Sequence, residues 1–221
     1  MRKSLLFGTL CLFISILGCA DKRKYHDTIK SDIASDNSEM VREILLFQNK
    51  LNEEFQNPET SPLPDRYRKD FDGLDFFKPD TSFRVIASME RTADAIPFMM
   101  PTTTDRLSEE VVYGVINFTL KGQKYSLEVY QNLELMQTTE YEDYLFLPFL
   151  DNTNGEETYA GGRYLDLAIP EGNSIILDFN KAYNPYCVYN KKYSCPIVPK
   201  RNFLNTKIMA GVKSFKQNSN K

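Results

Sequence analysis

Apolar and polar residues alternate along two neighbouring segments, residues 111–120 and 125–129, and this alternation is the strongest constraint on the fold. A period of two residues is typical of a half-buried β-strand. The apolar face carries Val112, Ile116, Phe118 and Leu120 in the first segment and Tyr125, Leu127 and Val129 in the second. Pairing these faces with Leu120 opposite Tyr125 leaves Gly122-Gln123 as a two-residue loop, with glycine first as a type II′ turn requires. We therefore expect an antiparallel hairpin.

The same pattern predicts a second hairpin over residues 165–179. Its apolar face would carry Leu165, Leu167 and Ile169 on one strand and Ile175, Leu177 and Phe179 on the other. Leu165 then lies opposite Leu177, and Pro170-Glu171-Gly172 forms the loop, with glycine at the left-handed position. This register places Tyr164 opposite Asp178, with Asp166 and Asn180 on the same polar face. That face either lines a cleft or is solvated, like the outer face of many antiparallel sheets.

Further strands are expected near residues 83–89 and 145–149, and no helical pattern separates the strands. The sequence therefore predicts a mainly β fold, an antiparallel barrel or sandwich. One amphipathic helix precedes it, from Ser38 to about Asn57, and Pro58 follows its end. Its apolar residues are Met40, Val41, Ile44, Leu45, Phe47, Leu51 and Phe55. We expect a single mostly β domain over residues 38–216 and a polar tail over 217–221.

The first residues have the pattern of an export signal. Met1-Arg2-Lys3 precedes an apolar run from Leu5 to Leu17 that is too short to span a bilayer. Ile16-Leu17-Gly18-Cys19 resembles the lipobox of bacterial lipoproteins, which implies cleavage before Cys19 and acylation of its thiol. The alternative is an ordinary signal peptide with a chance cysteine. We expect a signal peptide over residues 1–18 and a polar tether over 19–37. The lipid anchor would make the membrane a partner and place the protein in the bacterial cell envelope, facing the periplasm or the exterior.

The composition excludes several classes of function. A net charge of −3, with no segment rich in Lys and Arg, offers nucleic acid no electrostatic footprint. The one histidine, His26, lies in the tether, so Ser-His-Asp and Cys-His catalysis lack their central residue. Residues 151–155 lack the acidic pattern of an EF-hand loop, and Gly161-Gly162 lacks the spacing of a phosphate-binding loop. We expect no metal and no cofactor.

Long motifs fill residues 148–202. The chain reads PFLDNTNGEETYAGGRYLDL from Pro148, LDFNKAYNPYCVYN from Leu177 and YSCPIVP from Tyr193. With Met100-Pro101-Thr102-Thr103-Thr104, these motifs resemble domain-of-unknown-function family 1684 (DUF1684), bacterial proteins that include many lipoproteins, over residues 40–215. The resemblance implies a single mostly β domain and no settled reaction. The family pattern has glutamate where this chain has Val212, so a site that used this glutamate would be altered here.

Polar side chains of the motif region are the candidate ligand-binding residues. They are Asp151, Tyr159, Arg163, Tyr164, Asp178, Asn180, Tyr183, Asn184 and Tyr189. Most fall at expected strand ends and loops, where rigid scaffolds present ligand contacts. Arg163 falls on the apolar face, where it pairs with a buried carboxylate or holds an anionic ligand. Pairing within the protein is favoured, because long charged side chains are rarely buried without a partner.

Cys187 and Cys195 are the cysteines that remain after Cys11 is removed with the signal peptide and Cys19 is acylated. One even pair in an exported domain predicts a disulfide. The alternative is a reactive Cys187 whose thiol is activated by Arg163 or by a nearby lysine.

Three functions fit these observations. The favoured one is a membrane-anchored envelope lipoprotein that binds a small polar or anionic ligand in a cleft lined by Tyr, Asn, Arg and Asp. The second is a hydrolase or transferase in which Asp151 or Asp178 is the general acid or base and Arg163 stabilises an oxyanion. The third is a purely structural lipoprotein, in which the polar loop residues satisfy only their own backbone.

Overall fold

The computed structural model describes residues 37–215. The predicted signal peptide, the tether up to residue 36 with His26 and Cys19, and the predicted polar tail over 217–221 therefore lie outside the described residues. Helix α1 (Asn37–Gln56) matches the predicted helix to within one residue at each end. Its buried face carries Ile44, Phe47, Leu51 and Phe55. Leu45, which we expected on this face, is 45% exposed, because it lies about 100° around the helix from Ile44. No helix among the described residues is both long and apolar enough to span a bilayer.

The remaining elements are mainly strands. They are β1 (Arg84–Arg91), β2 (Phe98–Pro101), β3 (Leu107–Leu120), β4 (Gln123–Asn132), β5 (Tyr144–Asp151), β6 (Arg163–Ala168), β7 (Ser174–Asp178) and β8 (Phe203–Leu204). One further α-helix, α2 (Asp65–Arg68), follows α1. Short 3₁₀ helices are η1 (Thr81–Phe83), η2 (Leu135–Gln137), η3 (Phe179–Lys181), η4 (Tyr186–Val188) and η5 (Lys200–Asn202).

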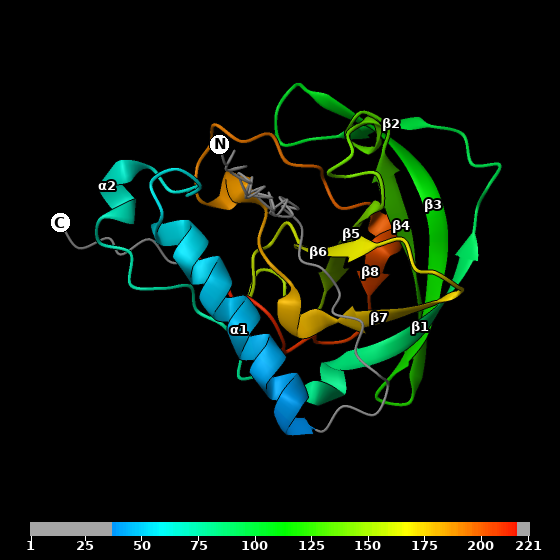
Figure 1. Ribbon diagram of the computed structural model, residues 1–221, viewed down its shortest axis with the longest axis horizontal. Coiled ribbons are helices and arrows are strands. Elements are labelled where there is room, and N and C mark those ends of the chain that lie inside the picture. Colours follow the sequence, from blue (N-terminus) through cyan, green and yellow to red (C-terminus); the bar gives the residue numbers. More distant parts are fainter. Residues whose placement is uncertain (1–36, 216–221) are drawn as a thin grey trace, which may run out of the picture.

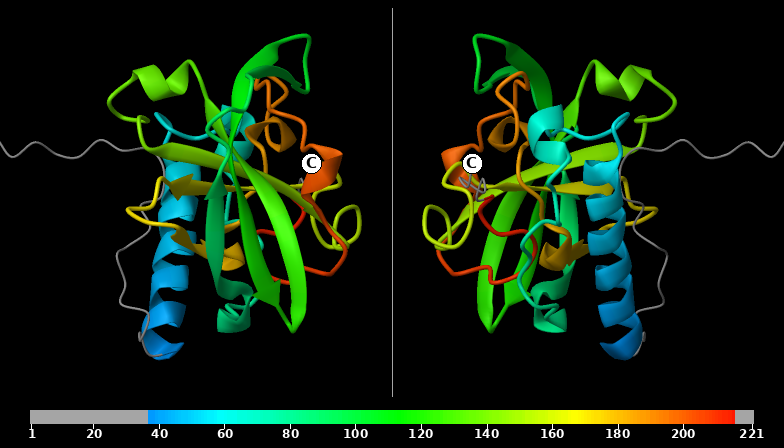
Figure 2. Two further views of the ribbon diagram at one scale, coloured as in Figure 1. Left: turned by 90° about the vertical axis from the view of Figure 1, so that its right-hand side faces the viewer. Right: turned by 90° about the vertical axis from the view of Figure 1, so that its left-hand side faces the viewer.

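The strands form one curled sheet in the order β6-β5-β4-β3-β1-β7, with β2 added to β3 and β8 added in parallel to β5. All other pairs are antiparallel, and the sheet curls into a half-barrel with α1 along one side (Figures 1 and 2). The predicted mainly β fold with one N-terminal amphipathic helix is therefore confirmed.

The first predicted hairpin exists as β3 and β4, but its register is shifted by two residues. Phe118 lies opposite Tyr125 and Leu120 opposite Gln123, so the loop is Lys121-Gly122. Both loop residues have positive φ, 51° and 81°, which is the geometry of a type I′ turn rather than the predicted type II′. A shift by two keeps side chains on their face, so Ile116, Phe118 and Leu120 are buried as predicted although their partners differ. Val112, predicted on the same face, packs instead with Met100 and Tyr130, because the strand has a bulge between Val112 and Gly114.

The second predicted hairpin is wrong. β6 pairs with β5, with Leu165 opposite Leu147, and β7 pairs with β1, with Leu177 opposite Val85, so the two strands lie at opposite ends of the strand order. Leu165 and Leu177 nevertheless share one core. The apolar pattern fixed which face each strand buries, and in a curled sheet two distant strands can bury that face together.

Three apolar clusters hold the fold together. The largest fills the concave face of the sheet and includes Ile116, Leu147, Leu165 and Leu177. A second lies under α1, where Phe47, Leu51 and Phe55 pack against later parts of the chain, Leu63, Leu74, Tyr189 and Val212. The third covers the other face of the sheet with Met100, Tyr130, Phe146, Tyr164 and Val198. Both faces of the sheet are therefore covered.

A fully buried ion pair joins the end of β5 to the start of β6. Arg163 Nη2 donates to Asp151 Oδ2 at 2.9 Å, and neither side chain is exposed to solvent. The same guanidinium donates to the carbonyls of Ile208 (2.8 Å), Ala210 and Val212 (3.3 Å). The favoured prediction, pairing of Arg163 within the protein, agrees with this geometry. One side chain thus fixes the C-terminal segment against the sheet.

Gly211 lets that segment pass close to its neighbours. Its φ is +77°, and a Cβ atom there would lie 2.7 Å from the carbonyl oxygens of Phe179 and Ala182. The residue after it, Val212, is 1% exposed and packs in the cluster under α1.

We predict that Arg163→Lys lowers the free energy of unfolding by about 3 to 5 kcal/mol, because lysine cannot reach Asp151 and the three carbonyls from one planar group. The matched control is Arg201→Lys, since Arg201 is 67% exposed in its pair with Glu128 and contributes about 1 kcal/mol at most. Chemical denaturation followed by circular dichroism measures both. Equal losses in the two variants would contradict the role assigned to Arg163.

Candidate functional site

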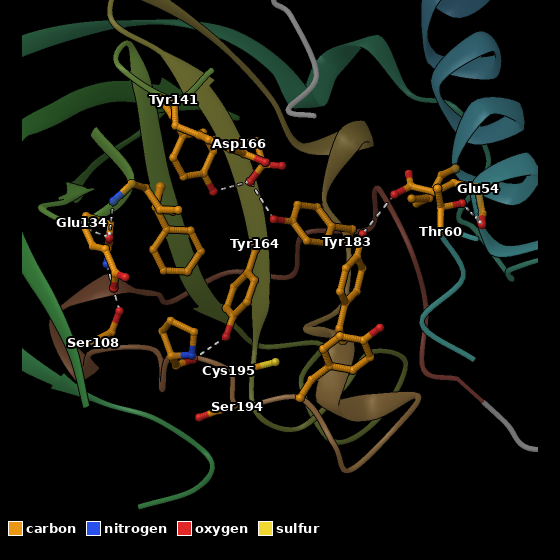
Figure 3. Close-up of a pocket in the computed structure, with 18 of the residues that line it drawn as sticks. Glu54, Thr60, Ser108, Glu134, Tyr141, Tyr164, Asp166, Tyr183, Ser194 and Cys195 are labelled. Carbon is orange, nitrogen blue, oxygen red and sulfur yellow. Dashed lines mark hydrogen bonds between the residues drawn. The ribbon is translucent and has the colours of Figure 1, made fainter. Parts of the chain in front are cut away.

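A cleft with a volume of about 990 Å³ opens on one side of the described residues. It lies between the C-terminal half of α1, the sheet face opposite the main core, and the loop that follows β7 (Figure 3). From α1 and the turn after it come Lys50, Leu51, Glu53, Glu54, Asn57, Glu59 and Thr60. From the strands and their connections come Arg106, Ser108, Glu110, Asn132, Glu134, Leu135, Tyr141, Tyr144, Phe146, Tyr164 and Asp166. The loop contributes Tyr183, Tyr186, Tyr193, Ser194, Cys195 and Pro196.

Asp166 lies at the centre of this cleft and is held by two tyrosines. Its Oδ1 accepts a hydrogen bond from Tyr144 Oη at 2.8 Å. It also accepts one from Tyr183 Oη at 2.6 Å (Figure 3). The strand period of two places Tyr164 and Asp166 together on the cleft face of β6. Tyr183 is brought to the same place because its backbone forms an isolated β-bridge with Tyr164. The N···O distances are 2.9 Å from Tyr164 N to Tyr183 O and 3.0 Å from Tyr183 N to Tyr164 O.

Burial changes the acidity of these groups. It raises the pKa of Asp166 to about 6, and the hydrogen bonds from Tyr183 and Tyr144 offset part of this effect. Burial also raises the pKa of Tyr144 and Tyr183 well above the ordinary value, and the neighbouring Asp166 carboxylate adds to the rise. The two phenols therefore remain hydrogen-bond donors to the carboxyl group.

Two further carboxyl groups lie in the cleft walls. Glu110 is 2% exposed, and its Oε1 accepts from Ser108 Oγ and from Asn132 Nδ2, both at 2.8 Å. Its Oε2 has no hydrogen-bond partner in the part of the chain that the structure describes. Glu54, on α1, accepts from Tyr186 Oη at 3.3 Å. Burial raises the pKa of both glutamates.

The structure separates the residues that the sequence predicted as one site. Tyr164 and Tyr183 line the cleft, as does Cys195. Asp151 and Arg163 are buried together away from it, so neither reaches a ligand there. The oxyanion role considered for Arg163 is therefore incompatible with its position.

Asp178 and Asn180 serve the backbone instead of the cleft. Asp178 caps η3 by accepting from the backbone N–H of Asn180, and the Asn180 amide bonds both the N–H and the carbonyl of Asp80. Their predicted neighbour, Tyr164, is separated from them because β6 and β7 do not pair. Both residues fix the turn between β7 and the loop that carries Tyr183.

The other candidates also lie outside the cleft. Asn184 donates to Tyr189 Oη at 3.2 Å and to the Lys213 carbonyl at 3.0 Å, and the Tyr189 ring packs edge-on against Phe55. Tyr159 is half-buried beside Gly161. Val212, where the family pattern has glutamate, does not line the cleft.

Cys187 and Cys195 lie next to each other as thiols, so the predicted disulfide stays a prediction. The backbone N–H of Cys187 donates to Cys195 Sγ at 3.2 Å. A hydrogen bond with the Cys195 thiol lowers the pKa of Cys187 to about 6, against the opposing effect of burial. The same contact, together with burial, raises the pKa of Cys195. The group that lowers the pKa of the Cys187 thiol is thus the Cys195 thiol. Arg163, which we considered as the activating residue, is paired with Asp151 instead.

Sequence reasoning missed most of the cleft carboxylates. The alternation along residues 164–167 placed Asp166 on a polar face, although its neighbours there were predicted wrongly. Glu54 and Glu110 carry no local signal, because a glutamate on a helix or strand is ordinarily solvated. No group of three or more His, Cys, Asp or Glu side chains within residues 37–215 is arranged to hold a metal ion.

We predict that Asp166→Asn removes a pH-dependent part of the stability. A carboxyl group whose pKa rises on folding stabilises the fold fully below its unfolded value, 3.8, and loses that contribution as the pH rises through about 6. Asparagine keeps an oxygen that accepts both tyrosine hydroxyls and does not ionise. Between about pH 4 and pH 7 the free energy of unfolding of the variant should therefore gain up to about 3 kcal/mol relative to the unaltered protein. Parallel pH profiles of the two proteins in denaturant titrations would contradict this assignment.

Comparisons with known proteins agree with this fold. The family model described as "Protein of unknown function (DUF1684)" matches residues 69–213. The solution NMR structure of an uncharacterized protein from Haloarcula marismortui is 31% identical, covers 80% of this chain and 95% of its own, and has a TM-score of 0.62. No curated protein matches the chain significantly. The match of the family model over most of the chain, together with this structural similarity, places the protein in the DUF1684 family.

Proposed function

We propose that this protein is a lipid-anchored binding module of the cell envelope whose cleft holds a small polar ligand. The observation that carries the proposal is Asp166, a carboxyl group fixed by two tyrosines at the centre of an open cleft. Ligand pockets commonly combine an apolar or aromatic wall with a few oriented polar groups, and perturbed acidity often marks them. Both features are present here.

The alternatives have less support. The hydrolase or transferase hypothesis needs Arg163 beside a reacting group, and this guanidinium is fully buried, with both terminal nitrogens engaged by Asp151 and backbone carbonyls. The purely structural hypothesis fits residues 151–158, where Asp151, Thr153 and Asn154 bond one another and the local backbone. It does not account for an open cleft lined by Glu110, whose Oε2 has no hydrogen-bond partner within the described residues. Binding is therefore the function that we propose.

The proposed lipid anchor is inferred from the sequence around Cys19. We predict that Cys19→Ala moves the protein from the detergent phase to the aqueous phase, because two or three acyl chains would otherwise retain it, at about 0.8 kcal/mol for each buried CH₂ group. Detergent phase partitioning of cell fractions is the measurement. Cys11→Ala, in the same signal region, is the matched control and should leave the partitioning unchanged. A Cys19→Ala protein that stays wholly with membranes would refute the anchor.

We predict that polar metabolites include a ligand that raises the melting temperature, and that Tyr183→Phe weakens its binding by about five- to thirtyfold. The variant removes the hydrogen bond from Tyr183 to the Asp166 carboxyl group. A hydrogen bond of this kind contributes roughly 1 to 2 kcal/mol, which corresponds to the expected loss of affinity. Tyr189→Phe is the matched control, because it removes a buried hydroxyl outside the cleft and should change affinity by less than about twofold. A screen of amines, sugars, amino acids and organic acids by thermal shift would test this. Equal losses in the two variants, or no stabilising compound at all, would count against the cleft.

A further inference from the structure

The side chains that line the cleft carry an excess of negative charge. Six are acidic and two, Lys50 and Arg106, are basic. The acidic residues are Glu53, Glu54, Glu59, Glu110, Glu134 and Asp166. None of these six forms an ion pair within the described part of the chain, whereas eight such pairs link other residues there. The cleft is therefore a region of negative potential that a cation would neutralise.

The carboxyl groups are spread along the cleft. Figure 3 shows Glu54 on one side, beside the helix, and Glu134 on the other, near Ser108, with Asp166 and the tyrosines between them. These groups come from three separate parts of the fold, which are α1, the connection after β4, and β6. A ligand that met all of them would be elongated, with positive charge at more than one point.

The hydrogen-bonding groups of the cleft are mostly acceptors. The hydroxyls of Tyr144 and Tyr183 donate to Asp166, and the hydroxyl of Tyr186 donates to Glu54. Tyr164 donates to the carbonyl of Pro196 in the same way. Each of these four hydroxyl donors is thus used within the protein, while the carboxylate oxygens keep lone pairs that can accept further bonds. A ligand rich in N–H groups would complement this surface.

Glu110 gives the sharpest indication of such a ligand. Glu110 lines the cleft with an exposed fraction of only 2%, and its Oε2, which is almost completely shielded from solvent, has no hydrogen-bond partner within residues 37–215. Buried polar atoms in native proteins almost always have a partner. Its other oxygen already accepts two bonds, from Ser108 and Asn132, which fix the carboxyl group in place. An ammonium group of a ligand would satisfy the remaining oxygen and its charge.

Aromatic rings supply the rest of the surface. Tyr141, Tyr144, Phe146, Tyr164, Tyr186 and Tyr193 line the cleft. Their faces attract alkylammonium groups through the ring quadrupole and also pack against methylene chains. A wall of this kind suits a flexible chain with ammonium groups better than a metal ion or a carboxylate ligand.

We propose that the cleft binds an elongated organic polycation of the polyamine class, with ammonium groups at Glu110 and Glu54 and its methylene chain along the tyrosines. This inference rests on the proposed function, because it specifies the ligand class of the same cleft. It replaces the anionic ligand considered from the sequence, since the arginine that was to hold an anion lies elsewhere.

The test compares three probes of equal chain length with the full chain in detergent at neutral pH. Octamethylenediamine carries two positive charges, octamethylene glycol carries none, and suberate carries two negative charges. Isothermal titration should give an affinity for the diamine at least about tenfold higher than for the glycol, and no binding of suberate. Equal or tighter binding of the glycol or suberate would overturn the inference while leaving the proposed binding function intact.

Variants separate specific contacts from general attraction. Glu110→Gln and Glu54→Gln should each weaken diamine binding by about tenfold, because each removes one charge that meets an ammonium group. Glu128→Gln, which alters a carboxyl group outside the cleft paired with Arg201, should leave the affinity unchanged. Melting temperatures measured on the same samples exclude unfolding as the cause.

The remaining outcomes decide between the two proposals. If the diamine does not bind but another polar metabolite stabilises the protein, the polyamine inference fails and the binding function stands. If no probe or metabolite of any charge binds, both fail. If all three glutamate variants lose affinity equally, the attraction is a general effect of net charge, and the assigned contacts are wrong.

Discussion

The buried ion pair between Arg163 and Asp151 is the interaction on which the rest of the structure depends. It joins two strands at one edge of the sheet, and the same guanidinium fixes the carbonyls of residues 208–212. That segment in turn bonds the Ala182 carbonyl through the Val212 N–H and bridges Phe76. Ala182 precedes Tyr183, so a charge in the core determines where a cleft tyrosine lies. Removing Arg163 would leave the Asp151 carboxylate buried without its charged partner, and the carbonyls of residues 208–212 would lose their hydrogen-bond donor.

Strand β6 carries a charged side chain on each of its two faces, one in the core and one in the cleft. Arg163 and Leu165 point into the core, and Tyr164 and Asp166 point into the cleft. The charge on the core side is neutralised by Asp151 and three carbonyls. The charge on the cleft side has only hydroxyl donors, which orient the carboxylate without cancelling it. A charge that is positioned but not neutralised is available to a ligand, and we regard this asymmetry as the basis for the proposed binding role.

Periodicity predicted the faces of the elements well and their partners poorly. The helix over residues 38–57 and the buried faces of β3, β4 and β6 followed from spacing, because burial repeats every two residues in a strand and about every 3.6 in a helix. The partner of β6 did not follow, since a shared core is compatible with a hairpin and with strands at opposite ends of a curled sheet. The prediction that the candidate residues form one site failed for the same reason. Glu54, Glu110 and Asp166 line the same cleft only because of strand order and helix packing, which no local pattern encodes.

The cleft walls are fixed by contacts that do not involve a ligand. On one side Leu51 and Phe55 hold α1 in an apolar cluster, and on the other Thr103 and Pro101 bond the backbone of Cys195 and Ile197. The tyrosine at position 183 is held by its own backbone bridge to β6. A ligand entering such a preformed cleft would order few side chains, so most of its interaction energy would appear as affinity. In the proposed function the same rigidity would favour a cation, because hydrogen bonds hold the carboxyl groups of Glu110 and Asp166 and keep them from turning away to admit an anion.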